Sequence, residues 1–464
     1  MDARHRETLL ARIEDGSAVV GIIGLGYVGL PLALAFVEKG FSVFGFDVDP
    51  EKVAKLERGE PYIKHLDGGR VQAAAATGRL RATTDFSRLG EPDVILICVP
   101  TPLTPQREPD MRYVDQSAWQ ISRSLRAGQL VVLESTTYPG TTDERVRHIL
   151  ESGDRRGAAA GSSGAGGVSS TGVTTQGLRC GVDYFLAFSP EREDPGNKNY
   201  GTTNTPKVVG GVDEASGDLA QALYDRIISK TVRVSSARAA EAAKLTENIF
   251  RAVNIALVNE LKIVYDKMGI DVWEVLDAAE TKPFGFMRFN PGPGWGGHCI
   301  PLDPFYLSWK AREYGVSTKF IELAGDVNVR MPEYVIEKLQ NALNQRGEPV
   351  KGSKILILGL AYKKDIDDPR ESPAFEIIDL LLKLGADVSY HDPHIPVAPP
   401  MRSWPGLPAM RSVGISGGAL AAYQAVVIIT DHSAIQYERL LAEARLIIDT
   451  RGVLRGPFQN VVQA

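Results

Sequence analysis

Six residues near the N-terminus, Gly24-Leu25-Gly26-Tyr27-Val28-Gly29, restrict the possible folds more than any other part of the chain. They follow the apolar run AVVGII and precede the helical pattern LPLALAFVEKG. Between a strand and a helix, Gly24 permits a tight turn, Gly26 lets a ligand approach the backbone, and Gly29 allows close packing. The helix N-terminus then faces the turn and favours a pyrophosphate there. The pattern predicts a Rossmann-type dinucleotide-binding unit.

An acidic residue stands where such a unit needs one. Asp47 ends the next apolar strand, FGFDVD, 18 residues after Gly29. A carboxylate there can accept hydrogen bonds from ribose hydroxyls and would repel the 2′-phosphate of NADP, so NAD is the expected cofactor. Lys52 lies close enough in the sequence to keep NADP as the alternative. The residues expected to bind the cofactor are Gly24, Gly26, Tyr27, Val28, Gly29, Asp47 and Lys52.

Buried-type strands recur in two groups along the chain. The first group comprises 18–26, 41–49, 93–100 and 129–136, with one more strand in CGVDYFLAFSPER. The second group comprises 354–365, 386–394, 425–432 and 445–452. Continuous apolar strands that alternate with helical segments indicate parallel sheets. Because the second group repeats the plan of the first, the sequence predicts two Rossmann-like halves.

A helical period without Gly or Pro runs from Arg238 to Met268 and would span about 45 Å. The predicted fold is therefore α/β, with two Rossmann-like parallel-sheet domains joined by a long central helix. A length of 464 residues agrees with roughly three units. We expect an NAD-binding domain at 1–235, a central helical dimerisation domain with a cysteine loop at 236–335, and a second Rossmann-like domain at 336–464. The Gly/Ser/Ala/Thr-rich segment 154–178 is predicted to be a mobile surface insertion without function.

Composition excludes several classes of protein. A net charge of −5 and a pI near 5.9 argue against a broad nucleic-acid-binding surface. Only three cysteines occur, none in a CxxC, which excludes a disulfide framework and a zinc cage. His298 and Cys299 lack further ligand-spaced partners, so no metal is expected. Neither a signal peptide nor a membrane-spanning run is present, and we expect a cytoplasmic protein without a membrane partner.

Cys299 lies in the segment FNPGPGWGGHCIPLDP, in which glycines and prolines force an irregular loop. Asp303-Pro304 then begin a helix, so the thiol precedes a helix N-terminus that favours its thiolate form. Cys299 is therefore a candidate nucleophile, with a buried structural thiol as the alternative. Cys98, within an apolar strand, is expected to be inert core. Cys180, which follows the insertion, has no organised surroundings in the sequence.

Other polar residues are open to two interpretations. Lys244 and Asn248 are four residues apart and share one face of the predicted helix, which could be catalytic or merely solvated. Glu191, in FSPERE, is either a turn residue or a base. In the second half, Lys363 and Arg370 follow a strand end that lacks the dinucleotide glycines. They suggest a different nucleotide ligand, with solvated basic residues as the alternative.

Taken in order, these segments resemble the nucleotide-sugar 6-dehydrogenases, the UDP-glucose dehydrogenase superfamily. The resemblance runs from about Val19 to Leu454, apart from 154–178. The motifs that carry it are GIIGLGYVGLPLA, DVDPEKV, VPTPLT, ESTTYPGTT, FSPERE, AAKLTENIFRAVNIALVNEL, GPGWGGHCIPLDPFYL and GLAYKKDIDDPRESPA. The block GGHCIPLDP is highly specific, and PGPGWGGHCIPLDPFYLSWKARE is most similar to enzymes that act on UDP-N-acetylglucosamine.

The resemblance implies an NAD-dependent, four-electron oxidation of the sugar's 6-hydroxymethyl group to a carboxylate, for surface polysaccharide synthesis. Cys299 would attack the aldehyde from the first oxidation, the thiohemiacetal would be oxidised, and water would hydrolyse the thioester. Pro195 stands where some UDP-glucose enzymes carry a second glutamate, so the hydrolytic base stays open. By resemblance, the catalytic residues are Cys299, Lys244, Asn248, Asp303, Glu191 and Thr136; the substrate-binding residues are Glu191, Arg192, Lys244, Asn248, Gly296, Lys363, Arg370 and Arg451; and Thr101 and Ser135 lie near NAD.

Alternatives exist at two levels. The same chemistry could act on UDP-N-acetylmannosamine, UDP-N-acetylgalactosamine or UDP-glucose instead of UDP-N-acetylglucosamine. A two-electron hydroxyacid dehydrogenase would use Lys244 as its acid/base and leave Cys299 structural, and a non-catalytic sensor would bind NAD and a UDP-sugar without turnover. The expected partners are a UDP-sugar and further copies of the chain, as a homodimer or higher homo-oligomer through the central helix.

Overall fold

The structure is a computed structural model. It describes residues 4–63, 66–104, 106–154, 177–192, 199–297, 300–401 and 403–464. The chain divides into two compact units, residues 1–247 with 305–317 and residues 248–304 with 318–464. The predicted insertion, apart from its ends, lies outside the described residues, as do His298 and Cys299. No helix within the described residues is both long and apolar enough to cross a membrane.

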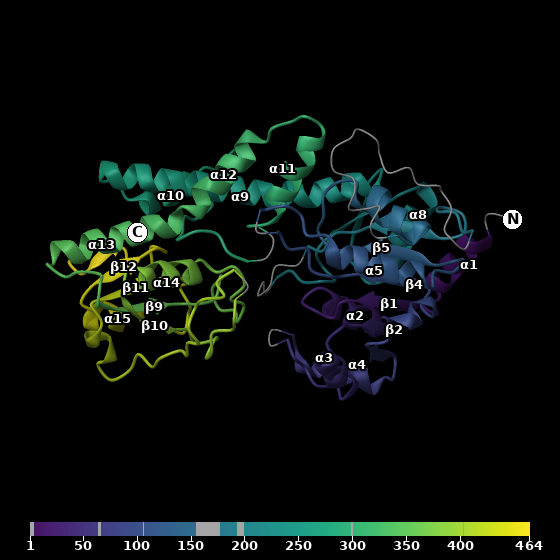
Figure 1. The fold of residues 1–464 in the computed structure, drawn as a ribbon, viewed down its shortest axis with the longest axis horizontal. Helices are drawn as coiled ribbons and strands as arrows, with labels where there is room; N and C mark the ends of the chain where they lie inside the picture. The colour runs from purple at the N-terminus through teal and green to yellow at the C-terminus, as the bar shows by residue number, and fades with distance from the viewer. Residues whose placement is uncertain are drawn as a thin grey trace. The chain divides into compact units, whose positions relative to one another are not determined.

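The first unit is built on an eight-stranded sheet in the order β3-β2-β1-β4-β5-β6-β7-β8 (Figure 1). Every neighbouring pair is parallel except β6 and β7. The strands are β1 (Val19–Ile23), β2 (Ser42–Phe46), β3 (Leu80–Thr83), β4 (Val94–Ile97), β5 (Leu130–Leu133), β6 (Phe185–Phe188), β7 (Lys207–Gly211) and β8 (Thr231–Arg233). The order reverses between β1 and β4, which is where ligands bind in open parallel sheets.

Helices of the first unit cover the sheet with their apolar faces. Residues of α1, α2, α4 and α8 form one buried cluster with alternate strand residues such as Val20, Ile22, Leu96 and Val132. Asp49 caps α3 by accepting the N–H groups of Glu51 and Lys52. The bounds are α1 (Arg4–Glu14), α2 (Gly29–Glu38), α3 (Pro50–Glu57), α4 (Gly68–Ala76), α5 (Arg112–Ser122), the π-helix η2 (Thr141–Val146), α6 (Arg147–Ser152) and α8 (Glu214–Asp225), with 3₁₀ turn η1 (Phe86–Gly90).

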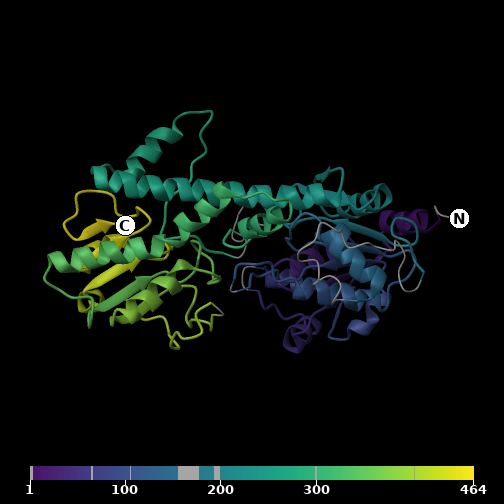
Figure 2. The ribbon, with the colours of Figure 1, turned by 45° about the horizontal axis from the view of Figure 1, so that its top comes forward.

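The second unit contains a five-stranded, wholly parallel sheet in the order β10-β9-β11-β12-β13. Alternate residues of β9 face opposite ways: Ile355 and Ile357 pack under α13 (Met331–Gln345) and α14 (Pro373–Lys383), and Leu356 and Leu358 pack with α15 (Tyr437–Glu443). The ribbon of this unit shows helices lying against its sheet (Figure 2). This period of two places helices on both faces. The strands are β9 (Lys354–Leu358), β10 (Asp387–His391), β11 (Ala425–Ile428), β12 (Ile447–Asp449) and β13 (Val461–Gln463).

Between the two sheets the chain is helical. The long helix α9 runs from Ala237 to Met268, one residue longer at its start than the sequence predicts. In the second unit Val258 of α9 packs with Val272, Trp273 and Leu276 of α10. The bounds are α10 (Val272–Glu280), α11 (Asp303–Glu313), α12 (Lys319–Val329), α13 (Met331–Gln345), α14 (Pro373–Lys383), α15 (Tyr437–Glu443) and 3₁₀ turn η3 (Ala419–Ala422).

The predicted α/β fold with two Rossmann-like halves and a long helix is confirmed, but four short strands were missed. β3, β8 and β13 have only three or four residues each, too few for an alternating pattern to register. β7 carries two glycines, which normally weaken a strand prediction. Both are needed there, since a Cβ on Gly210 would lie 2.2 Å from the Ser236 carbonyl oxygen and one on Gly211 2.3 Å from that of Asp213.

Candidate active site

The glycine turn between β1 and α2 has the geometry that the sequence predicts. Gly24 has φ +91°, and a Cβ there would lie 2.5 Å from the Cys98 carbonyl oxygen. A Cβ on Gly29 would lie 1.9 Å from the Gly24 oxygen, so the helix crosses the strand at a distance only glycine allows. A Cβ on Gly26 would meet no described atom within 4 Å. The turn therefore leaves open space at the N-terminus of α2, as a bound pyrophosphate requires.

Asp47 is held beside this turn at the end of β2. Only 6% of the residue is exposed; its Oδ2 accepts the Leu25 N–H at 2.9 Å and its Oδ1 accepts the Asp49 N–H at 3.0 Å. The Lys52 ammonium lies 3.5 Å from Oδ2. Lys52 therefore neutralises Asp47 in part, and its charge is not left over to bind a 2′-phosphate. The residues present fit NAD rather than NADP.

Ser135 joins the ends of two strands beside the turn. Its hydroxyl accepts the Val99 N–H at 3.0 Å and donates to the Val99 carbonyl at 2.7 Å, which ties the end of β5 to that of β4. Thr101 is buried at 6% exposure, and Thr136 is half-buried. These three residues thus lie along the carboxyl edge of the sheet, where a ligand of a parallel sheet binds.

Lys244 of α9 and Glu191, after β6, are in direct contact. The Lys244 Nζ donates to the Glu191 carbonyl oxygen at 2.5 Å and lies 3.6 Å from its Oε2. The Lys244 side chain is 4% exposed and that of Glu191 16% exposed. A cation in such a low-dielectric setting can stabilise a developing negative charge strongly.

A small cavity lies next to Glu191. Its lining includes Val28, Glu191, Thr205 and Lys207, and its volume of about 20 Å³ has room for one water molecule. Among the described residues, Glu191 Oε1 and Thr205 Oγ1 are buried without a hydrogen-bond partner. Both residues line the cavity, and a buried oxygen without a partner is the kind of group that an ordered water satisfies.

Arg192 is held close to the same strand end. Its guanidinium donates to both carboxylate oxygens of Glu247, with 3.2 Å from Nε to Oε2, and its Nη1 donates to the Pro206 carbonyl at 2.8 Å. The Arg192 charge is therefore already paired inside the first unit. Any contact with a substrate phosphate would have to share this guanidinium with Glu247.

In the second unit, Asn248 bridges two charged side chains. Its Nδ2 donates to Asp303 Oδ2, and Arg251 donates to its Oδ1. Because arginine only donates and a carboxylate only accepts, this pair of partners fixes which end of the amide faces Asp303. Asn248 is fully buried and Asp303, the first residue of α11, is 4% exposed. The structure thus brings together two of the predicted catalytic residues.

The glycine-rich loop before Cys299 packs against the second sheet. A Cβ on Gly296 would lie 2.7 Å from the Tyr362 Cβ, and one on Gly292 the same distance from Arg451 Nη1. The Gly297 N–H donates to the Arg370 carbonyl at 3.1 Å. The loop therefore passes directly beside the strand ends that carry Lys363, Arg370 and Arg451. The predicted nucleophile itself lies outside the described residues.

Comparison with known proteins places these features in one family. The chain matches the NAD-binding domain of the UDP-glucose/GDP-mannose dehydrogenase family over residues 18–228, its central domain over 238–330 and its UDP-binding domain over 356–456. The chain belongs to the UDP-glucose/GDP-mannose dehydrogenase family. It is an NAD-dependent nucleotide-sugar dehydrogenase, and the sequence predictions of family, enzyme class and NAD cofactor are confirmed.

Relatives in this dehydrogenase family differ in the sugar they act on. The chain is 34% identical over 415 residues to UDP-N-acetyl-D-glucosamine 6-dehydrogenase of Pseudomonas aeruginosa, covering 89% of this chain and 90% of that one. It is 35% identical over 452 residues to an NDP-N-acetyl-D-galactosaminuronic acid dehydrogenase of Ralstonia nicotianae, covering 94% and 96%. The solved UDP-D-ManNAc dehydrogenase of Pyrococcus horikoshii superposes with a TM-score of 0.81 at 30% identity, covering 96% and 98%.

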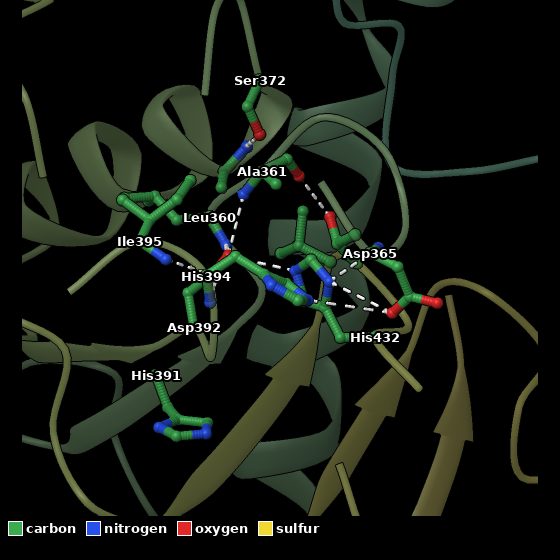
Figure 3. Close-up of polar contacts among 12 residues, drawn as sticks. Leu360, Ala361, Asp365, Ser372, His391, Asp392, His394, Ile395 and His432 are labelled. Atoms are coloured by element: carbon green, nitrogen blue, oxygen red, sulfur yellow. Dashed lines mark hydrogen bonds and ion pairs between the residues drawn. The ribbon is translucent and has the colours of Figure 1, made fainter. Parts of the chain in front are cut away.

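The UDP-binding half has kept the Rossmann acid but uses it internally. Asp392, after β10, accepts the N–H groups of Leu360 at 2.6 Å and Ala361 at 3.0 Å (Figure 3). This matches how Asp47 accepts the Leu25 N–H in the first half. Unlike Asp47, Asp392 also accepts from His432 Nε2 at 3.1 Å, and both side chains are fully buried. The Asp392 carboxylate is therefore unable to accept hydrogen bonds from ribose hydroxyls, so this half of the chain does not offer a dinucleotide site.

Asp392 is held ionised by these contacts. Burial acts to raise the pKa of its carboxyl, but the hydrogen bond from His432 and the N–H groups of Ala361 and His394 outweigh it and lower the pKa to about 2.

The same corner brings three possible metal ligands, Asp365, His394 and His432, within 4.8 Å of one another (Figure 3). His432, however, donates from Nε2 to Asp392 and accepts the Asp365 N–H at Nδ1, at 3.0 Å. Asp365 in turn accepts from the Ser433 N–H and hydroxyl, both at 2.7 Å. Both nitrogens of His432 therefore already have hydrogen-bond partners. We interpret the cluster as a set of hydrogen bonds that holds the ends of β9, β10 and β11 together, rather than as a metal centre.

The two described cysteines are free thiols with raised pKa values. Burial raises the pKa of Cys98, which directly follows β4 and is a half-buried residue packed against the core of the first unit. The prediction that Cys180 has no organised surroundings is wrong. Cys180 pairs with Tyr184 in an isolated bridge and lies with Sγ 3.9 Å from Asp213 Oδ2, and burial followed by the Asp213 charge raises its pKa to about 12.

Three polar residues of the site escaped the sequence analysis: Glu241, Arg251 and Asp392. Glu241 and Arg251 lie three residues from Lys244 and Asn248 on α9, a spacing that places them on neighbouring positions of one helix face. Asp392 stands in YHDPH, the counterpart of FGFDVD. Both signals were present in the sequence, but nothing in it says which partner each side chain meets.

Proposed function

We propose that the chain catalyses a four-electron oxidation of the C6 hydroxymethyl group of UDP-N-acetylglucosamine to the carboxylate, in surface polysaccharide synthesis. The observation that carries the proposal is the one-water cavity at Glu191, beside the buried Lys244. A two-electron oxidation consumes no water, whereas the hydrolysis of an acyl intermediate consumes one. A carboxylate oxygen without a protein partner, Glu191 Oε1, gives that water a place and a base.

Both units contribute residues with a proposed catalytic role. NAD, when bound, accepts the hydride at each oxidation. In the first unit, Lys244 stabilises the negative charge that develops on the substrate oxygen, while Glu191 and Thr136 orient the water. In the second, Asn248 supplies an amide donor for substrate oxygen and Asp303, hydrogen-bonded to Asn248, moves a proton.

Cys299 is the proposed nucleophile. Its thiolate adds to the aldehyde, and the thiohemiacetal so formed can give up a second hydride to become a thioester. The assignment rests on the sequence GGHCIPLDP, because the residue lies outside the described part of the chain. Replacing Cys299 with Ser tests it: loss of carboxylate formation supports the covalent route, and full turnover would favour the two-electron alternative.

The UDP-sugar is proposed to bind where Lys363, Arg370 and Arg451 line the second sheet. Arg370 is anchored by Asp368, 2.9 Å from Nε, and Arg451 Nε donates to the Ile429 carbonyl at 2.6 Å. Burial lowers the pKa of Arg451. Cations fixed in this way are preorganised for a diphosphate. Relatives named for N-acetylglucosamine, N-acetylmannosamine and N-acetylgalactosaminuronic acid nucleotides are 34%, 32% and 35% identical to this chain. UDP-N-acetylmannosamine and UDP-N-acetylgalactosamine are therefore the alternatives, and UDP-glucose is a further one.

The experiment that decides the sugar is NADH production by the purified enzyme across these four nucleotide sugars. The proposal predicts that UDP-N-acetylglucosamine is among the best by kcat/KM. If kcat/KM for another of these sugars is more than about tenfold higher, that sugar replaces UDP-N-acetylglucosamine as the proposed substrate. A tenfold ratio corresponds to a contact worth about 1.4 kcal/mol.

We also propose that the enzyme is a cytoplasmic homodimer or higher oligomer. Phe250, Leu257, Val264 and Met268 of α9 are each between 45% and 62% exposed. Successive spacings of seven, seven and four residues place them in one apolar stripe, the pattern of a helix that pairs with another. The free thiols Cys98 and Cys180 agree with a reducing compartment.

A further inference from the structure

A buried glutamate on α9 has no place in the mechanism above. Glu241 is fully buried, one turn before Lys244. Its Oε2 accepts the Gly140 N–H at 2.7 Å, and its Oε1 accepts both the N–H and the hydroxyl of Thr142, at 2.9 and 2.6 Å. All three donors belong to the segment that follows β5 and carries Ser135 and Thr136.

The burial of Glu241 costs free energy, because the side chain loses its hydration. Within the described residues it forms no ion pair, and burial raises its pKa to about 8 against the opposing effect of the Thr142 and Gly140 hydrogen bonds. A buried acid without a cation persists only where its hydrogen bonds have a structural or functional use. The use has to be sought in the segment it holds.

The backbone of that segment is shaped to reach the carboxylate. Gly140 has φ +101°, and the chain then enters the π-helix η2 instead of an ordinary α-helix. This turn directs the N–H groups of residues 140 and 142 toward Glu241. Short π-helical turns are frequent at functional sites.

Several side chains of α9 hold the site loops, Glu241 among them. Arg238 also donates to Asp143 and Glu144 of η2. Lys244 donates to the carbonyl of Glu191, and Glu247 accepts from Arg192. The spacing of three residues puts Glu241, Lys244 and Glu247 on one face of the helix. Through them, the loop after β5 and the segment after β6 are both fixed to the same turns of α9.

We propose that Glu241 is a positioning residue, which fixes the loop that carries Thr136 relative to Lys244 so that both groups act on one substrate carbon. The inference rests on the proposed function of Thr136 and Lys244. It assigns Glu241 no contact with substrate or cofactor. Backbone N–H groups face both side-chain oxygens of Glu241, so in the Glu241→Gln variant one of these donors would meet the NH₂ group of the amide.

Two variants test the contact from opposite sides. Glu241→Gln alters the acceptor, and Thr142→Val removes one donor while keeping the shape of the side chain. Thr142→Ser restores the hydroxyl and is the rescue. Glu337→Gln, at an exposed position in the middle of α13, is the matched control for the loss of one carboxylate. Folding of each variant is checked by its thermal midpoint, and if Glu241→Gln does not fold, the Thr142 pair alone carries the test.

The expected result is a fall in kcat of about tenfold to a hundredfold for Glu241→Gln and for Thr142→Val, the size of effect that misplacing a catalytic group produces. The KM for NAD should stay within about twofold, because the nucleotide turn is not touched. Thr142→Ser and Glu337→Gln should keep the wild-type kcat. Wild-type kcat in both Glu241→Gln and Thr142→Val, or an equal loss in Thr142→Ser, would overturn the inference.

Failure of the proposed function would look different. In that case the wild-type enzyme itself would not release NADH with any of the four nucleotide sugars. Amide hydrogen exchange at Gly140 and Thr142 then reads out the contact without turnover. Faster exchange at both amides in Glu241→Gln, with unchanged exchange in β1 and β4, is expected; unchanged exchange at both amides would overturn the inference on its own.

Discussion

The Lys244 ammonium lies 2.5 Å from the backbone carbonyl oxygen of Glu191 and 3.6 Å from the carboxylate of the same residue. This contact joins α9 to the end of β6 by a charge that is almost wholly buried. It means that the cation is already fixed before a substrate arrives, and that its position depends on the backbone of residue 191 rather than on a mobile side chain.

Replacement of Lys244 by Met is expected to lower kcat by about a hundredfold to a thousandfold, the usual loss when a preorganised electrostatic group is removed. The KM for NAD should change little, because Lys244 acts through its contact with Glu191, whereas the pyrophosphate is expected at the glycine turn before α2. Steady-state kinetics check this, with Lys267→Met, an exposed lysine of the same helix, as the control. Equal losses in the two variants would contradict the assignment.

Replacement of Asp47 by Asn is expected to raise the KM for NAD and to reduce discrimination against NADP. The carboxylate is the group that repels a 2′-phosphate, and the variant also frees Lys52, now 3.5 Å from Asp47, to attract one. The measurement is the ratio of kcat/KM for the two cofactors. An unchanged ratio would mean that neither Asp47 nor Lys52 distinguishes the ribose of NAD from the 2′-phosphorylated ribose of NADP.

Stability should depend on pH through Asp392. Its folded-state pKa, about 2, is below the ordinary value of 3.8, so the stabilisation is present above about pH 4 and is lost as the pH falls toward 2. A shift of this size corresponds to about 2 kcal/mol. Urea unfolding should show that Asp392→Asn is less stable than wild type by about this amount at pH 7. The gap should narrow below pH 4; a gap that stays constant would show that the charge of Asp392 is not responsible.

The apolar stripe on α9 should be needed for self-association. Leu257 and Val264 are 50% and 45% exposed, and charges at both positions would leave unpaired groups inside an interface between two helices. We expect Leu257→Arg combined with Val264→Arg to shift the mass in light scattering toward the monomer. Glu337→Lys, at an exposed position of α13, raises the net charge by the same two units away from the stripe and is the control for net charge. An unchanged mass would place the interface elsewhere.

Motifs that bind through the backbone could be predicted, and partnerships between distant side chains could not. The turn at Gly24 and Gly29 was foreseen because a Cβ has no room there, which is a local property of the chain. The extent of α9 followed from its unbroken helical period. By contrast, Glu241 meets Gly140 and Thr142 across about a hundred residues, and that pairing exists only once the sheet has formed.

The same limit explains the second half of the fold. Lys363 and Arg370 suggested a nucleotide site because basic residues after a strand are a local pattern. The reason that a dinucleotide no longer fits there is the contact between Asp392 and His432, 40 residues apart. Cys180 illustrates the reverse error, since its neighbours in the sequence are uninformative while its neighbour in space, Asp213, is a charged residue.

The most direct test of the central claim is the amount of NADH formed per nucleotide sugar consumed, measured at completion with limiting UDP-N-acetylglucosamine and excess NAD. Four-electron oxidation requires two NADH for each sugar and yields a carboxylate that takes up one oxygen from ¹⁸O-labelled water by way of the cavity at Glu191. A ratio of two with one labelled oxygen is the predicted result. A ratio of one, with an aldehyde or ketone as the product, would contradict the account.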